Sequence, residues 1–195
     1  MTTALILIDL QNDFLHPDGA YARGGCANPA AAALPERLQP LIRKVKAGNG
    51  LVIASQFTLW PNALGEPMIS PHLLALRPFL RHGDFAPGSW GQDCVDLLKP
   101  SLNLAVQKVA YSAFYQTQLE WVLRKVGVDR VIVGGIVTNG GVASTVRDAH
   151  MRDFETYVVS DGCAAFTTEK HDTALADMAN VATVSTIEAL CGGSL

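Results

Sequence analysis

Short runs rich in valine, isoleucine and leucine alternate along the chain with longer segments of helical spacing. The runs are apolar almost throughout, as expected of parallel strands that helices cover on both faces. They are Ala4–Asp9, Gly50–Gln56, Leu104–Lys108, Arg130–Ile136, Glu155–Asp161 and Ala182–Thr186. The helical segments are Leu34–Ala47, Trp90–Leu98, Gln116–Val126, Val142–Arg152 and Glu169–Ala179. This alternation predicts a doubly wound, Rossmann-like α/β fold in three layers, with a six-stranded parallel sheet in the middle.

The composition limits what such a fold would bind. A chain of 195 residues is long enough to bury one core, so residues 1–195 are expected to form a single domain. The 15 lysines and arginines are scattered and the net charge is −3, which argues against nucleic acid as a partner. The first apolar run is too short for a membrane span and has no basic flank. We therefore expect a cytoplasmic protein that binds a small molecule.

The irregular stretch from residue 57 to residue 89 departs from the alternation. It contains five prolines and two histidines, His72 and His82, and its only cationic residues are Arg77 and Arg81. Irregular stretches of this length in a compact domain are usually functional or mobile. We expect it to pass over a binding pocket, where either histidine could touch a substrate, although isolated histidines more often lie at the surface.

Polar residues mark the carboxyl ends of the predicted strands, where open α/β sheets bind their ligands. The first strand ends at Asp9 and the third at Lys108. A carboxylate at the end of a buried strand is costly to desolvate unless a cation pairs with it, which makes Asp9 and Lys108 a candidate catalytic dyad. The alternatives are that Asp9 caps a turn and that Lys108 is an ordinary solvated lysine.

Two segments of the chain resemble motifs of a known enzyme family. The segment LILIDLQNDF resembles the first motif of the isochorismatase-like hydrolase superfamily, which also includes nicotinamidases and other cysteine amidohydrolases. The stretch from Gln107 to Phe166 is similar to the rest of the family's core, in the same order. The resemblance covers nearly the whole chain and implies a hydrolase with Asp9 and Lys108 as catalytic residues. It also implies a homo-oligomer, a dimer or larger.

The chain departs from the family at the nucleophile. The family's cysteine lies in a loop of the form T-x-x-C-V-x-x-T, and the residues here are Thr138 to Thr145 with Gly141 in the place of the cysteine. A glycine has no side chain to attack a substrate, so the covalent amidase mechanism is not expected. Cys163 is the nearest other thiol and is best interpreted as a buried structural residue. The glycine at position 141 could be natural, or it could result from deliberate replacement of a cysteine.

No metal or other cofactor is expected. Nicotinamidase-like members carry an Asp-x-His-x-x-His cluster after the second strand, whereas this chain has the sequence SQFTLW at residues 55–60. The four cysteines form no CxxC pair, so a zinc site is not indicated elsewhere either.

The resemblance still implies chemistry that needs no thiol. Isochorismatases within the superfamily also have glycine at this position, and they hydrolyse a vinyl ether through a protonated carboxylic acid. Asp9 would be that acid if burial raises its pKa, with Lys108 orienting it or holding the substrate. The alternatives are an amide hydrolase in which Asp9 activates water, and a binding homologue without catalysis.

Further residues are predicted to contact the substrate. The backbone N–H groups of the loop around Gly141 would hold a carboxylate or carbonyl oxygen, and a non-proline cis peptide is expected near Val137–Thr138 by resemblance. Gln56 matches a substrate-contacting glutamine of isochorismatases, or else bonds a neighbouring loop. The predicted substrate-binding residues are Gln56, Phe14, Trp60, Phe114, Val137, Thr138 and Gly140. The aromatic residues that could wall the pocket are Phe14, Trp60, Trp90, Tyr111 and Phe114, and any one of them could equally belong to the core.

Overall fold

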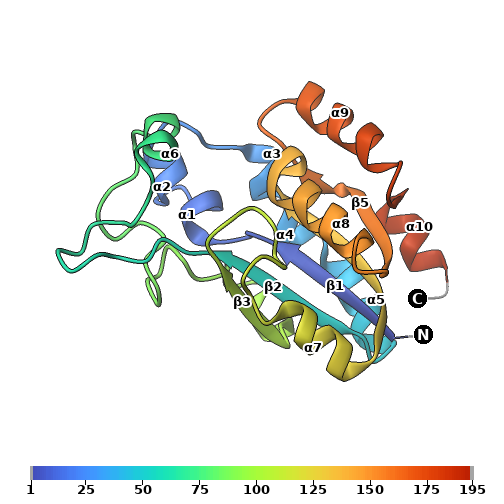
Figure 1. Cartoon of the computed structure of the whole chain (residues 1–195). Coiled ribbons are helices and arrows are strands. Elements are labelled where there is room, and N and C mark those ends of the chain that lie inside the picture. The colour runs from blue at the N-terminus through green and yellow to red at the C-terminus, as the bar shows by residue number, and fades with distance from the viewer. Residues whose placement is uncertain (1, 194–195) are drawn as a thin grey trace.

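The computed structural model describes residues 2–193, and its centre is a six-stranded parallel sheet (Figure 1). The strand order is β3-β2-β1-β4-β5-β6. The strands are β1 (Thr2–Ile8), β2 (Leu51–Phe57), β3 (Leu104–Lys108), β4 (Val128–Ile136), β5 (Glu155–Ala164) and β6 (Thr183–Ser185). Every predicted strand is present, and its ends differ from the prediction by three residues or fewer. The predicted Rossmann-like sheet is confirmed.

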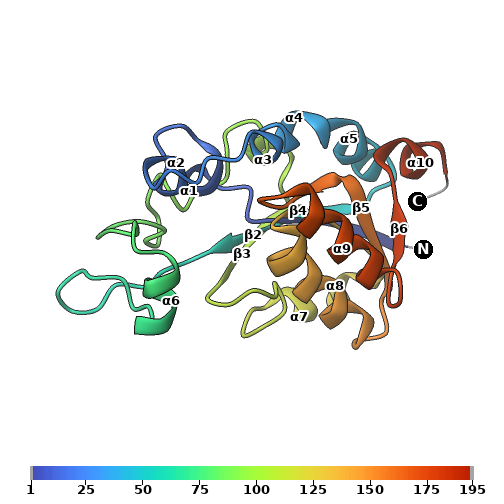
Figure 2. The ribbon, with the colours of Figure 1, turned by 90° about the horizontal axis from the view of Figure 1, so that it is seen from above.

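Helices cover both faces of the sheet. The helices are α1 (Asn12–Leu15), α2 (Ala20–Arg23), α3 (Pro29–Ala32), α4 (Leu34–Arg37), α5 (Gln39–Ala47), α6 (Pro71–Leu76), α7 (Leu119–Val126), α8 (Ala143–His150), α9 (Thr168–Met178) and α10 (Ile187–Gly192). Helices α7, α8 and α9 lie on one face, and α4, α5 and α10 on the other, as the view in Figure 2 shows. None of the helices in residues 2–193 is both long and apolar enough to cross a bilayer.

The two helical layers pack against alternate residues of the central strand. Ala4, Ile6 and Ile8 of β1 belong to the cluster under α7, α8 and α9, whereas Leu5 and Leu7 belong to the cluster under α4, α5 and α10. Successive side chains of a strand point to opposite faces, so a strand buried on both sides must be apolar at every position. This is why the predicted strands were visible as continuous apolar runs.

The order of the strands reverses between β1 and β4. From β1 the chain builds β2 and β3 on one side, and then returns to place β4 on the other side of β1. Gly135 pairs with Ile8 across this boundary and has a φ of +121°. A Cβ at this position would overlap the Ile8 backbone, so only glycine lets the two strands approach here. Ligands of open α/β sheets bind at such a reversal.

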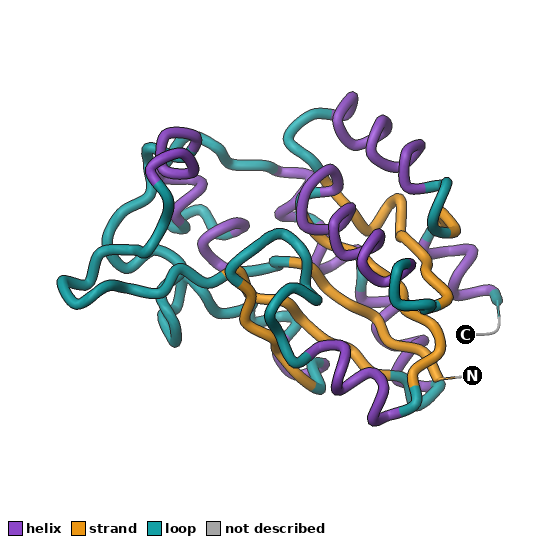
Figure 3. The backbone as a smooth tube through the Cα atoms, in the orientation of Figure 1, coloured by secondary structure: helices purple, strands orange, loops and turns teal. Residues whose placement is uncertain are grey.

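Residues 58–94, which we call the cap, extend beyond the carboxyl ends of the central strands (Figure 1). Figure 3 shows them mainly as loops on the left of the molecule, with α6 as a short helix among them. A small separate core of Ala20, Tyr21, Leu59, Leu80 and Phe85 joins the cap to α2. The predicted excursion over the sheet edge is therefore present, and it contains one helix that its composition did not indicate.

Two helical predictions were wrong in detail. Residues 90–98 form turns, because their backbone bonds to the segment after β1: Gln11 and Cys94 form an isolated bridge, and the Val95 N–H donates to the Leu10 carbonyl at 3.1 Å. The predicted helix at residues 34–47 is divided into α4 and α5 at Leu38. Pro40 has no N–H to donate to the preceding turn, which accounts for the break. The short helices α1, α2, α3, α6 and α10 had not been predicted.

Candidate active site

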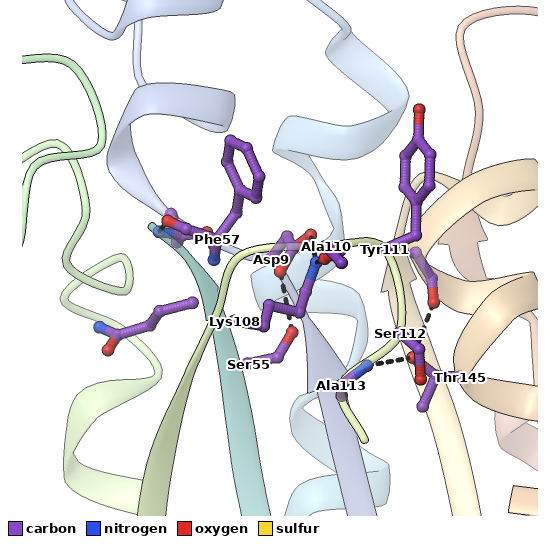
Figure 4. A network of polar contacts seen from close by, with 12 residues as sticks. Asp9, Ser55, Phe57, Lys108, Ala110, Tyr111, Ser112, Ala113 and Thr145 are labelled. Carbon is purple, nitrogen blue, oxygen red and sulfur yellow. Dashed lines mark hydrogen bonds and ion pairs between the residues drawn. The ribbon is translucent and has the colours of Figure 1, made fainter. Parts of the chain in front are cut away.

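Asp9 and Lys108 meet at the carboxyl edge of the sheet, beside the boundary between β1 and β4. Asp9 follows the last residue of β1 with a φ of +56°, and Lys108 is the last residue of β3. Its Nζ lies 2.8 Å from Asp9 Oδ2. Ser55 of β2, the strand between them, donates its hydroxyl to Asp9 Oδ1 at 2.8 Å, as Figure 4 shows. The predicted pair is therefore an ion pair across three strands.

The Lys108 ammonium group is held in place by several contacts. It also donates to the Ala110 carbonyl at 2.9 Å and lies 5.6 Å from the centroid of the Phe57 ring. Only 1% of the residue is exposed. A lysine enclosed in this way is not a solvated surface residue, and its contacts fix its position next to Asp9.

Burial controls the state of Asp9, of which 5% is exposed. Desolvation raises the pKa of its carboxyl group above the ordinary value of 3.8, and the opposing effects of Lys108, Ser55 and the Phe57 backbone do not cancel this. Desolvation penalises the charged form of a carboxyl group. Asp9 therefore holds its proton to a higher pH than an exposed aspartate, as an acid catalyst requires.

The loop that carries Gly141 borders the same site. A Cβ built on Gly141 would lie 3.4 Å from Asp9 Oδ2, so the family's nucleophile position directly faces the Asp9 carboxyl group. Residues Thr138–Val142 form a π-helical turn, and Thr145 Oγ1 donates to the Gly141 carbonyl at 2.7 Å. The space that a thiol would occupy thus lies next to the acid.

Two details of this loop differ from the prediction. The cis peptide joins Ile136 and Val137, one residue before the expected bond. The N–H groups of Gly140 and Val142 both donate to the Val137 carbonyl, at 2.9 and 3.3 Å. Since these two donors are used within the loop, they do not form the predicted cradle for a substrate oxygen.

A small pocket of about 70 Å³ opens between the sheet edge and the cap. Its lining residues are Asp9, Phe14, Tyr21, Phe57, Arg77, Lys108, Tyr111, Ile136, Val137, Gly141 and Phe166. Of the predicted site residues, the structure brings together Asp9, Lys108, Gly141, Phe14 and Val137. Neither Trp60 nor Phe114 blocks the pocket, and Lys108 is not displaced from Asp9, so the geometry does not favour the inactive homologue.

Gln56 does not line the pocket. Ser55 and Gln56 are neighbours on β2, and successive side chains of a strand point to opposite faces. Because the Ser55 hydroxyl bonds to Asp9, Gln56 is directed away from it and contacts the thiol of Cys94. The alternative that Gln56 holds a neighbouring segment is the one that the structure supports.

The predicted aromatic residues Trp60 and Phe114 also lie outside the pocket. Trp60 is 46% exposed on the outer part of the cap. Phe114 is buried in the core below α7 and α8, where its ring lies 6.0 Å from that of Phe154. The placement of Phe114 agrees with the core alternative, whereas Trp60 belongs to neither the core nor the pocket.

Thr138 and Gly140 lie behind the pocket wall. Thr138 is fully buried, and its Oγ1 lies 2.8 Å from Nδ1 of His171 on α9, which holds the loop against that helix. Gly140 packs against the ring of Tyr111. Both residues shape the loop around Gly141 and neither faces the pocket.

Residues 3–189 match the family model described as the Isochorismatase domain. The chain belongs to the isochorismatase family. Ureidoacrylate amidohydrolase RutB of Caulobacter vibrioides is 31% identical over 172 residues, which cover 82% of this chain and 76% of that protein. An isochorismatase family protein from Desulfovibrio vulgaris superposes with a TM-score of 0.82 at 27% identity, covering 97% of this chain and 96% of that one. N-carbamoylsarcosine amidase from Thermoplasma acidophilum gives 0.74 at 27% identity, covering 96% and 98%.

As a member of the isochorismatase family the chain is a hydrolase, and its two buried cysteines, Cys94 and Cys163, do not replace the missing nucleophile. Burial raises the pKa of the Cys163 thiol to about 12 and that of Cys94 to about 12. Neither lines the pocket. A nucleophilic cysteine needs a low thiol pKa and access to the substrate, and these two residues have neither.

Among the described residues of the isochorismatase-family site, no set of metal ligands is present. Residues 55–60, at the end of β2 and just beyond it, contain no histidine or carboxylate. Within residues 2–193, no cluster of three histidine, cysteine or acidic residues is arranged to hold a metal ion. The donors that a zinc or related ion needs are therefore not present at this edge of the sheet.

The motif after Asp9 is mainly structural. Gln11 donates to the Phe57 and Gln92 carbonyls and accepts from the Phe57 N–H. Asp13 accepts from the N–H groups of Ala20 and Phe85, at 3.0 and 2.7 Å. The family's first motif thus combines one acid that faces the pocket with side chains that tie the cap to the sheet.

The lining residues outside the set of predicted site residues come from separate parts of the chain. They are Tyr21, Phe57, Arg77, Tyr111, Ile136 and Phe166, of which Tyr111 had been named as a possible pocket wall. Tyr111 follows β3 by three residues and Phe166 follows β5 by two, so both obey the rule that ligands bind beyond the carboxyl ends of strands. Arg77 had a different signal, as one of only two cationic residues in the irregular stretch.

Proposed function

We propose that this chain hydrolyses a small vinyl ether, with Asp9 as the general acid and without a covalent enzyme intermediate. One observation carries the proposal: the buried Asp9 carboxyl, whose pKa is raised, faces the position where the family's cysteine would be, and Gly141 supplies no side chain there. An acid that keeps its proton beside a pocket without a nucleophile suits protonation of the substrate.

The proposed hydrolysis consumes one molecule of water and needs no other co-reactant. Asp9 gives its proton to the terminal vinyl carbon, which forms a C–H bond and leaves an oxocarbenium ion. Water adds to the cationic carbon, and the proton that it loses returns to Asp9. The resulting hemiketal breaks its bond to the leaving oxygen, which takes the hydroxyl proton, so the products are an alcohol and a ketone. Lys108 holds Asp9 in position and stabilises the carboxylate that forms transiently.

The test uses an enolpyruvyl ether such as isochorismate in D₂O. Proton transfer from Asp9 to carbon predicts pyruvate with a single deuterium in its methyl group, detected by NMR immediately after turnover. Asp9→Asn is expected to lower kcat by about a thousandfold, within the range of general acid catalysis. Asp96→Asn, which removes an exposed carboxylate outside the pocket, is the matched control and should leave the rate unchanged. Turnover at the normal rate in Asp9→Asn would rule out this role.

A second candidate is amide hydrolysis by water that Asp9 activates as a base. The observation in its favour is that two similar proteins are named as an amidohydrolase and an amidase. The two candidates predict opposite pH profiles: an acid acts below its pKa and loses activity as the pH rises, whereas a base gains activity. Ammonia release from an amide panel, with a rate that increases through the pKa of Asp9, would favour this alternative over the first.

The proposal also includes a cytoplasmic homo-oligomer, as expected from the sequence and the family resemblance. Size-exclusion chromatography with light scattering measures the mass of the assembly directly. A monomer at micromolar concentration would contradict this part and leave the proposed reaction untouched.

A further inference from the structure

Arg77 is the cap residue that brings a second cation, besides Lys108, to the pocket. It follows the last residue of α6 and is half-buried. Its Nε donates to the Tyr21 hydroxyl at 3.0 Å, and its Nη2 donates to the Tyr111 hydroxyl at 3.3 Å. All three side chains line the same pocket as Asp9. They come from α2, the cap and the segment after β3, so the tertiary fold brings them together.

The guanidinium group of Arg77 has no acidic partner among the residues that the structure describes. Within residues 2–193, no carboxylate lies in ion-pair distance of Arg77. Arg23, which lies nearby on α2, instead pairs with Asp84 at 2.5 Å. A partly buried cation without a counterion is costly, because its desolvation is not offset by an attractive charge. An anion from outside the chain would supply that missing interaction.

The two hydroxyl groups around Arg77 are arranged as donors. Each tyrosine oxygen accepts an N–H from Arg77, so its own proton remains free to donate. Burial raises the pKa of Tyr21, which keeps this phenol neutral. A guanidinium group and two O–H donors are a suitable set for the two oxygens of a carboxylate.

The net charge of the pocket also favours an anionic ligand. Lys108 is paired with Asp9, and the net charge of this pair is zero when Asp9 is ionised and positive when Asp9 is protonated. Arg77 therefore leaves the pocket with a net positive charge. A neutral substrate would not use that charge, whereas an anion would.

We propose that Arg77, Tyr21 and Tyr111 form an anion subsite that binds the carboxylate of a small substrate. The Tyr111 hydroxyl points away from the Asp9–Lys108 pair in Figure 4, so the subsite and the acid hold different ends of the ligand. The substrate class is a small carboxylic acid whose hydrolysable group reaches Asp9 and Gly141. This inference rests on the proposed function only in assuming that the pocket is the substrate site.

The test is equilibrium binding, which does not require turnover. Benzoate and pyruvate are titrated into the intact protein by calorimetry, with nitrobenzene as a neutral probe of the same shape as benzoate. Arg77→Gln is expected to weaken both anions at least tenfold and to leave nitrobenzene unchanged. Arg77→Lys keeps the charge but cannot span both hydroxyls, so an intermediate loss is expected. Higher salt should weaken the binding of the anions alone.

Arg81→Gln is the matched control. It removes the same charge four residues away, from an exposed side chain that does not line the pocket, and should leave anion binding unchanged. Circular dichroism and the melting temperature of Arg77→Gln establish that the variant is folded. Equal binding of the anions to wild type and Arg77→Gln, or no saturable binding of either anion to wild type, would overturn the subsite.

The outcomes separate this subsite from the proposed reaction. Arg77-dependent anion binding without hydrolysis of any vinyl ether or amide would support the subsite and contradict the reaction. Hydrolysis of a carboxylated vinyl ether with an unchanged KM in Arg77→Gln would support the reaction and overturn the subsite.

Discussion

The carboxyl edge of the sheet and the cap contribute to the same pocket in different ways. At the sheet edge, strand register places Asp9, Ser55 and Lys108, and all three are buried. The cap instead exposes large apolar side chains such as Trp60 and Leu64, and it is tied to the sheet by side chains of the motif after β1. Under the proposed function, the chemistry belongs to the buried sheet edge and substrate selection to the cap.

This comparison makes a general prediction about variants. Changes at the sheet edge should alter the stability of the whole domain, kcat or the pH profile, because the acid and its partners are there. Changes in the cap should alter KM or local order and leave the pH profile in place. Four substitutions test this distinction, in order from the largest expected effect to the smallest.

Gly135→Ala should have the largest effect, because it tests the contact between β1 and β4. A Cβ at Gly135 would overlap the Ile8 backbone, and its φ of +121° is unfavourable for alanine. Overlap and backbone strain together should lower the free energy of unfolding by about 4 kcal/mol. Urea denaturation measures the loss. Gly127→Ala is the matched control, since its φ is also positive but its surroundings are open, and about 1 kcal/mol is expected. Equal losses would contradict the steric explanation.

Asp13→Ala tests the connection of the cap. It leaves the N–H groups of Ala20 and Phe85 without their acceptor, which should lower stability by about 2–4 kcal/mol. Hydrogen exchange should accelerate around residues 79–93 more than in the strands. Asp96→Ala, at an exposed site, is the control and should change neither quantity. Uniform acceleration over sheet and cap would mean that the two regions do not differ in stability as described.

Ser55→Ala tests the acid at the sheet edge. Burial raises the pKa of Asp9, and the Ser55 hydroxyl opposes this by stabilising the carboxylate. An acid catalyst is active below its pKa, so the rate should fall as the pH rises through that value. Removing the hydroxyl raises the pKa further, and the falling limb of kcat/KM should move upward by about one pH unit. Ser112→Ala, whose hydroxyl bonds the Phe114 N–H, is the control. A limb that stays in place would contradict the role of Asp9.

Trp60→Ala should have the smallest effect. This side chain is large but 46% exposed and outside the pocket. Stability should change by less than about 0.5 kcal/mol and KM by less than about twofold, as for other surface positions. Phe14→Ala, which removes a pocket wall, is the contrasting variant and should raise KM. A large effect of Trp60→Ala would place substrate contacts on the outer cap.

The sequence predicted the sheet edge better than the cap because strands follow simple rules. A continuous apolar run fixes a strand, and the residue that ends it must lie at the ligand-binding edge, which was sufficient for Asp9 and Lys108. Gln56 was misplaced although the same rules apply to it. The alternation of side chains along a strand puts Gln56 opposite Ser55, and the bond between Ser55 and Asp9 then decides which one faces the site.

The cap residues could not be placed by such rules. Arg77 and Tyr21 are 56 positions apart, and their contact depends on how α6 and α2 fold over the sheet. No period or local signal indicates this. Residues 90–98 have helical spacing, yet their backbone bonds to the segment after β1 instead. Tertiary contacts overrode the local preference there.

Gln11 has a consequence for the order in which the chain folds. Its amide reaches both the end of β2 and the returning segment at Gln92, two parts of the chain that are 35 positions apart. The hydrogen bonds between Gln11 and Phe57 form only once β1 and β2 are aligned. The complete set of Gln11 bonds, including the one to Gln92, therefore cannot form before the central strands do. The cap is thus expected to fold late and to open first under mild denaturant, leaving the acid on its strand.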